Sequence, residues 1–93
     1  EISPDGQTLL FVGLRRPDGY GLGDIYASQV RDGRFTPAIN LGPCVNSAKD
    51  DFHPSAQWQE GLLVFERNPG DAALKGDFLV VPLPALALPA AAR

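Results

Sequence analysis

The feature that most constrains the fold of this chain is an internal repeat. Residues 3–12 read SPDGQTLLFV and are followed by GDIYAS at residues 23–28. A less regular second copy reads WQEGLLVF at residues 58–65 and GDFLVV at residues 76–81. Each copy places a turn sequence before one apolar run and a loop before the next, which is typical of antiparallel β-strands. The repeat therefore predicts two similar β units.

The first copy predicts a sheet that begins with a tight hairpin. Pro-Asp-Gly at residues 4–6 is typical of such a turn, because proline presets the backbone and glycine accepts a positive φ angle. A second turn is indicated at residues 31–34, and Pro37 favours an edge position for its strand, since proline has no N–H to donate. Residues 8–14 are rich in Leu, Phe and Val, which predicts a strand buried on both faces. The strands predicted for this unit cover residues 8–14, 24–30 and 35–41.

The second copy predicts the same order of strands. It follows the first by about fifty residues, a period within the range of propeller and array repeats. A short fourth strand is expected near residues 84–88, with a frayed terminal segment as the alternative. The other predicted strands cover residues 51–57, 62–66 and 77–81. We therefore expect an all-β fold with two four-stranded antiparallel sheets, at residues 1–43 and 51–88, followed by a tail at 89–93.

Composition narrows the function classes. The net charge is −3 and the basic residues are scattered, so no surface for nucleic acid is predicted. Cys44, the single cysteine, excludes an internal disulfide and a multi-cysteine metal site, and we expect it to be a small buried side chain. The apolar tract at residues 78–92 is interrupted by three prolines, so no membrane span is predicted. The chain starts at Glu1 without an apolar leader, which indicates either a removed targeting segment or an excerpt from a longer protein.

Four segments together carry a resemblance to a known family. They read SPDGQTLLF at residues 3–11, DIY at 24–26, FTPAINLGPCVNS at 35–47 and DFHPS at 51–55. This pattern resembles the TolB-like, Pro-Asp-type β-propeller repeat, although residues 58–61 read WQEG in place of Ser-Pro-Asp-Gly. The resemblance implies that each unit is a propeller blade, in a bacterial protein of the periplasm or cell envelope that serves as a scaffold for protein or ligand contact.

Two blades are too few to close a propeller ring, which typically needs four to eight. We therefore expect residues 1–93 to form a single partial, unclosed propeller, and we favour a fragment of a longer propeller. The alternatives are an assembly of several copies and a free-standing pair of sheets with exposed flanks. Further blades or self-association are thus possible partners of the chain.

The long loops are where we expect a binding site. In an up-and-down sheet the loops at residues 15–23, 42–50 and 67–76 fall on one rim, and loops on a rigid scaffold often carry function. The candidate ligand-binding residues near this rim are Asn46, Asp50, Asp51, His53 and Tyr20. Their oxygens and imidazole suit a divalent cation or a hydroxyl-rich ligand. The competing interpretation, which we favour, is that Asp50 and Asp51 cap the loop through hydrogen bonds and that His53 is structural.

The inventory of catalytic motifs is thin. Ser55 lies two residues from His53, but this pair has no third orienting group and no oxyanion hole. We therefore predict no catalytic residue, no metal and no cofactor for this chain. The sequence favours a non-catalytic scaffold segment that binds a protein, peptide or glycan at the rim formed by the three long loops. The alternative is the propeller portion of a larger hydrolase, a serine peptidase or glycosidase, whose catalytic residues lie outside this chain.

Overall fold

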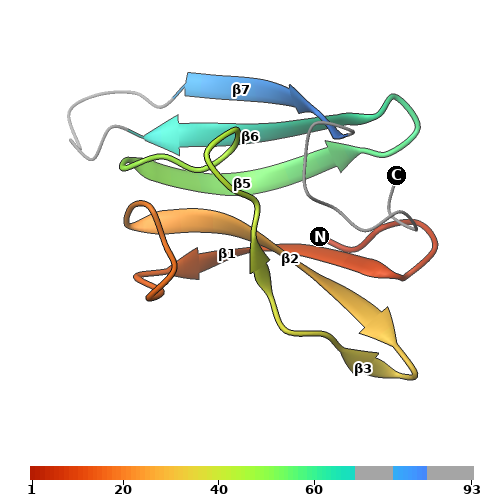
Figure 1. Ribbon diagram of the computed structural model, residues 1–93. Helices are drawn as coiled ribbons and strands as arrows, with labels where there is room; N and C mark the ends of the chain where they lie inside the picture. The colour runs from red at the N-terminus through yellow and green to blue at the C-terminus, as the bar shows by residue number, and fades with distance from the viewer. Residues whose placement is uncertain (69–76, 84–93) are drawn as a thin grey trace.

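The computed structural model describes residues 1–68 and 77–83, which form two antiparallel β-sheets (Figure 1). The strands are β1 (Thr8–Leu14), β2 (Gly23–Arg31), β3 (Arg34–Phe35), β4 (Ile39–Asn40), β5 (Asp50–Gln57), β6 (Leu62–Asn68) and β7 (Asp77–Pro82). The predicted all-β class with two antiparallel sheets is confirmed. The fourth strand expected near residues 84–88, the 67–76 loop beyond residue 68 and the tail lie outside the described residues. None of the described residues belongs to a helix that could span a membrane.

The first sheet is built around β2. Its residues from Gly23 to Gln29 pair with β1, while β3 and then β4 pair with its other edge. The single strand predicted over residues 35–41 is therefore divided in two. The division falls at Pro37, which has no N–H for the ladder, so Thr36 bonds to β2 instead through both its backbone and its hydroxyl oxygen. The predicted edge position of this segment is confirmed.

A further short paired segment precedes β1. Ile2 forms an isolated antiparallel bridge with Leu9, and the Leu10 N–H donates to the Glu1 carbonyl at 2.7 Å. The N-terminal ammonium of Glu1 donates in turn to the Leu10 carbonyl. Residues 1–3 thus occupy, in shortened form, the place that β5 has in the second sheet.

The two predicted turns of the first unit are confirmed by backbone geometry. Gly6 has a φ of 72°, and its N–H donates to the Ser3 carbonyl. Asp32 and Gly33 both have positive φ between the paired residues Arg31 and Arg34, which is the two-residue turn that matches strand twist. The Ser3 hydroxyl and the Gln7 N–H both donate to the Asp5 carboxylate and hold its pKa below the ordinary value.

The corresponding turn of the second unit has a different geometry. Both units place four residues between the last paired positions, Ser3 with Thr8 and Gln57 with Leu62. The positive φ lies on the third of these four in the first unit and on the fourth, Gly61, in the second. When the two units are aligned by these paired positions, Leu62 corresponds to Thr8. Leu63 and Phe65 of the second unit then correspond to Leu9 and Phe11 of the first.

The two sheets stack through the region where β5 lies against β1 and β2 (Figure 1). In the first sheet the paired residues Leu10 and Ala27 face this interface, and in the second Leu63 and Phe65 do. The buried core consists of Leu10, Ile25, Ala27, Leu41, Val45, Ala56, Leu63, Phe65 and Leu83. Leu63 and Phe65 correspond to Leu9 and Phe11, which lie on the face of the first sheet that points away from the interface. The first sheet therefore contributes one face of the repeat unit to the interface and the second sheet contributes the opposite face, an arrangement that we call head-to-tail stacking. Opposite faces of equivalent units meet.

Two burial predictions were wrong. β1 is not buried on both faces: only Thr8 and Leu10 are buried, the other residues up to Gly13 are half-buried, and Leu14 at its end is exposed. The doubly buried strand is β2, because it is central in its sheet and has the second sheet on one face and the 15–22 loop near the other. Cys44 is exposed rather than buried, since its neighbour Val45 is the residue of this loop that enters the core.

Candidate functional site

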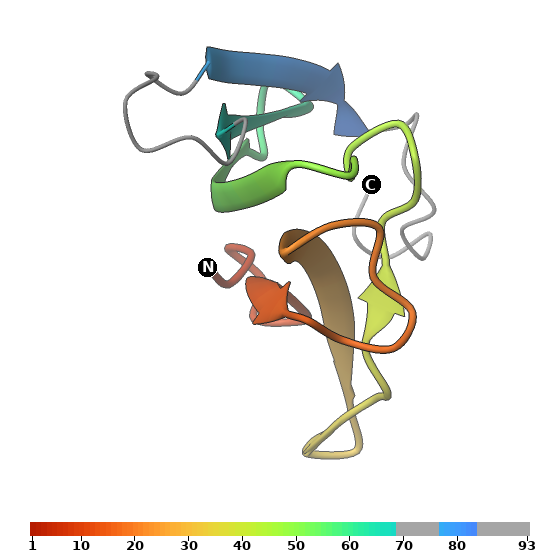
Figure 2. The same ribbon diagram turned by 90° about the vertical axis from the view of Figure 1, so that its left-hand side faces the viewer.

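Two of the three long loops meet at one end of the molecule. In Figure 2, which looks at this end, the loop after β1 and the segment that leads into β5 lie side by side. They touch at two glycines: a Cβ on Gly21 would overlap the backbone oxygens of Ser47 and Lys49, and one on Gly23 would overlap the Asp50 carboxylate. The short turns lie at the opposite end (Figure 1). We call the meeting of residues 15–22 and 42–50 the loop junction.

Asn46 joins the second of these loops to the first sheet. Its Oδ1 accepts the Ile25 N–H at 2.6 Å, and its Nδ2 donates to the Ile25 carbonyl at 2.9 Å and to Asn40 Oδ1 at 2.8 Å. An amide side chain can pair with both backbone groups of one residue because it carries a donor and an acceptor side by side. Asn46 thus continues the edge of β2 beyond β4 and is fully buried.

Asp51 connects the same loop to β6. One carboxylate oxygen accepts from both the N–H and the hydroxyl of Ser47, and the other accepts from Arg67 Nε at 2.6 Å. Arg67 faces Asp51 across the β5–β6 pair and also donates to the Val45 carbonyl. Asp51 is completely buried, so this ion pair and its hydrogen bonds must satisfy the carboxylate without water.

The first loop is held by a second set of contacts. Asp24 is buried, and its Oδ2 accepts the Tyr20 N–H at 2.6 Å. Asp18 accepts from the Tyr26 hydroxyl at 2.8 Å, and Arg16 lies over the Tyr26 ring. Burial of Tyr26, followed by the hydrogen bond to Asp18, raises the pKa of its phenol. These contacts fold the loop over the outer face of β2.

The predicted site residues do not form one cluster. Asn46, Asp50 and Asp51 lie at the loop junction, and the exposed Tyr20 lies on the loop facing them. His53 is separate: its side chain is 75% exposed, and its Nδ1 lies 3.4 Å from Glu66 Oε2. The ring also packs edge-on against Phe52, next to the irregularity in the β5–β6 pairing.

The hydrogen bonds decide what this junction can do chemically. Asn46 and Asp51 direct their polar atoms at protein groups, as the capping interpretation of Asp51 anticipates. Within residues 1–68 and 77–83, no group of three His, Cys, Asp or Glu side chains is placed to hold a metal ion. The junction is therefore a rigid support whose exposed side chains, rather than its buried ones, are free to meet a partner.

The exposed surface of the junction combines apolar and basic side chains with the exposed Arg16–Asp18 ion pair. Leu14, Tyr20 and Leu22 are exposed apolar or aromatic residues beside the exposed cations Arg15 and Lys49. We call these five residues the long-loop rim. Of these five residues, the sequence analysis gave only Tyr20 as a candidate ligand-binding residue, because isolated exposed residues give no periodic signal. It also missed Arg67 as the partner of Asp51, which only the cross-strand register reveals.

Comparison with known proteins adds no relative. No protein-family model matches the chain, and searches of curated proteins and of solved structures found no significant match.

Proposed function

We propose that this chain is a pair of consecutive blades of a TolB-like β-propeller and acts as a non-catalytic scaffold that binds a protein or peptide. The observation that carries this proposal is the head-to-tail stacking of the two sheets. In a propeller each blade presents one face to the preceding blade and the opposite face to the next, and ring closure protects the sheet edges. By the same resemblance, we propose the bacterial periplasm or cell surface as its location.

The outer face of the second sheet supports this reading. Phe78 and Val80 on β7 point away from the core and are 75% and 57% exposed. Val64, which pairs with Val80, shares that face. Exposed apolar residues that line up on one sheet face are unusual for a surface that only meets water. A further blade stacked in the same sense would cover them.

The long-loop rim is the binding surface we propose. Its base is rigid, because Asn46, Asp51 and Asp24 tie the loops to the strands. Its exposed side chains offer apolar contact from Tyr20 and Leu22 and positive charge from the neighbouring arginine and lysine. Aromatic anchors within a charged border are typical of protein contact surfaces. The chemistry that fits best is a peptide segment with acidic and apolar residues.

The proposal can be tested by selecting peptides against the chain from a displayed library. Affinities of the selected peptides are then measured by fluorescence anisotropy for the natural chain and for a Tyr20→Ser, Leu22→Ser variant. A Phe78→Ser variant, which alters an even more exposed apolar residue away from the rim, is the control. We expect binding of acidic, apolar peptides that the rim variant loses and the control retains. Binding that survives in the rim variant, or no selected peptide at all, would contradict the proposal.

A further inference from the structure

A cleft lies at the far end of the first sheet from the long-loop rim. Its volume is about 350 Å³, and its walls include Ala27, Pro37 and Ile39. Its lining residues lie where the chain leaves β2 between β3 and β4, at Pro37. Figure 1 shows that β2 diverges from the second sheet toward its hairpin tip in this region. The walls are mostly apolar, and the size is at the small end of pockets that hold small molecules.

One end of this cleft is polar and contains a buried hydrogen-bond donor that has no acceptor among the described residues. Gln29 lines it and is only 5% exposed. Its Oε1 accepts from Arg31 at 2.8 Å, but its Nε2 has no hydrogen-bond partner among the described residues. The cross-strand neighbour Thr8 has a buried hydroxyl in the same condition. A buried donor of this kind normally has an acceptor, so the amide indicates a binding group that residues 1–68 and 77–83 do not supply.

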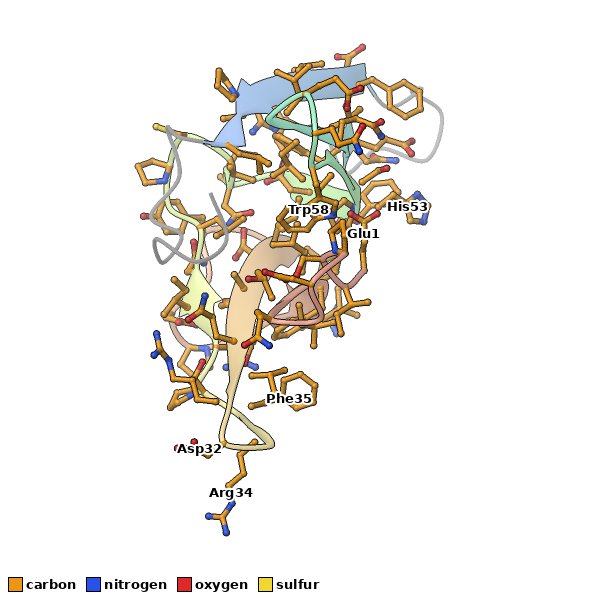
Figure 3. All side chains as sticks on the ribbon, turned by 90° about the vertical axis from the view of Figure 1, so that its right-hand side faces the viewer. Glu1, Asp32, Arg34, Phe35, His53 and Trp58 are labelled. Atoms are coloured by element: carbon orange, nitrogen blue, oxygen red, sulfur yellow. The ribbon has the colours of Figure 1, made fainter. Side chains whose placement is uncertain are left out.

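The positive charge of Arg31 lies beside this amide. Arg31 lines the cleft, and Arg34 is its directly paired residue across the β2–β3 turn. Within residues 1–68 and 77–83, neither arginine forms an ion pair, although Asp32 lies in the turn between them. Figure 3 shows Arg34 at the tip of the hairpin, pointing away from the body of the molecule. Like charges at paired positions repel each other, and an anion nearby would relieve that repulsion.

We propose that this cleft binds a small carboxylic acid with an apolar body. The carboxylate would accept from the Arg31 guanidinium and from Gln29 Nε2, while the apolar body would pack against Ala27, Pro37 and Ile39. A guanidinium with an adjacent amide donor matches the two oxygens of a carboxylate, and the apolar walls match a short hydrocarbon body. The site shares no residue with the long-loop rim, so it is independent of the function proposed above.

The test is a titration of the 93-residue chain with octanoate, followed by isotope-edited NMR of backbone and Gln side-chain amides. Octanol and octylamine, which carry the same hydrocarbon body with a neutral and a positive head group, are the matched probes. We expect octanoate to bind at least about tenfold more tightly than either, because only it pairs with the guanidinium. The largest shifts should fall on the Gln29 side-chain amide and on the residues around Pro37.

Two variants and one control complete the experiment. Arg31→Met keeps the exposed apolar stem and removes the charge, and it should weaken octanoate binding by about tenfold or more. Gln29→Glu places a carboxylate beside Arg31 and should block octanoate. Arg15→Met removes an equivalent exposed charge at the rim and should leave octanoate binding unchanged. Absence of octanoate binding, equal binding of octanol, or binding that Arg31→Met does not change would overturn the proposal, whatever happens to peptide binding at the rim.

Discussion

Replacing Asn46 by alanine tests whether this one side chain holds the long loop to the first sheet. Asn46 bonds both backbone groups of Ile25 and the side chain of Asn40, and it is buried. Alanine would leave the Ile25 N–H without an acceptor in the interior, whereas the Ile25 carbonyl would keep its bond from the Leu41 N–H. The stability lost therefore has two parts: the cost of one buried N–H without an acceptor, and the net contribution of the other hydrogen bonds that are removed.

The expected size of the effect follows from these contacts. Each hydrogen bond contributes about 1 kcal/mol net, and an unsatisfied buried donor costs about 1–3 kcal/mol. The stranded Ile25 N–H and the two other lost bonds together mean that Asn46→Ala should lower the free energy of unfolding by about 3–5 kcal/mol. A chain of this length is expected to have a total stability of roughly 5–14 kcal/mol, so the substitution removes a large share of it.

Urea unfolding followed by tryptophan fluorescence measures this change through Trp58, the single tryptophan. The midpoint should fall while the slope with denaturant stays the same, because the surface exposed on unfolding hardly changes. Gln59→Ala, which removes the same amide group from an exposed turn, is the control and should stay within about 0.5 kcal/mol of the natural chain. An Asn46→Ala variant as stable as this control would refute the reasoning.

Three further outcomes follow from the same contacts. Arg67→Met should cost about 3 kcal/mol in urea unfolding, because it strands the buried Asp51 carboxylate, and adding Asp51→Asn should restore part of that loss; a fully stable single variant would contradict this. The raised pKa of Tyr26 means that the folded chain holds this proton more tightly than the unfolded chain, so its contribution to stability is complete below the ordinary pKa of 10.0 and is lost as pH rises through the folded value. Stability measured against pH should fall more steeply above that point in the natural chain than in Tyr26→Phe, and parallel curves would count against it. Gly21→Ala should lower the midpoint of thermal unfolding more than Gly33→Ala, because a Cβ at Gly21 would meet the backbone of the neighbouring loop. A Cβ at Gly33 would have open space, and only the positive φ there would cost stability, about 1 kcal/mol. The reverse order would refute the close packing of the loops.

The parts of the fold that could be predicted from the sequence are those set by neighbouring residues. Pro-Asp-Gly at residues 4–6 and Asp32-Gly33 fix their turns through φ preferences alone, so both turns were found without knowledge of the rest of the chain. Pro37 was correctly placed on an edge for the same kind of reason, since a missing N–H acts locally. The division of its strand was missed because Thr36 could reach β2 through its hydroxyl only in this particular register.

The candidate site was less predictable because its partners are distant in the sequence. Asn46 was named from its polarity, but its actual role depends on Ile25, 21 positions away, which has no paired strand residue on the edge of β2 that faces away from β1. Arg67 is 16 positions from Asp51 and faces it only because β5 and β6 pair in this register. His53 was grouped with these residues by sequence distance alone, and the irregular pairing beside it turns the ring outward. Polar residues can thus be identified locally, but their partners are set by strand register.

The length of the turn before β6 decides which face of the second sheet packs against the first. That choice decides in turn whether a further sheet can stack on the pair. Aligning Gly61 with Gly6 would match Leu63 with Thr8 and Phe65 with Leu10, so equivalent faces of the two sheets would meet and close the stack as a two-sided sandwich. The observed pairing of Gln57 with Leu62 shifts this alignment by one residue. Because side chains alternate between the two faces of a strand, the shift turns the opposite face of β6 toward the first sheet. Opposite faces therefore meet, and the face that carries Phe78 and Val80 is left open in the direction of stacking. Lengthening this turn by one glycine should then disrupt the packing of Phe65, because it would tend to rotate β6 by one face. Loss of the cooperative unfolding transition would be the measured result, and a variant that unfolds like the natural chain would contradict the claim that turn length sets the stacking sense.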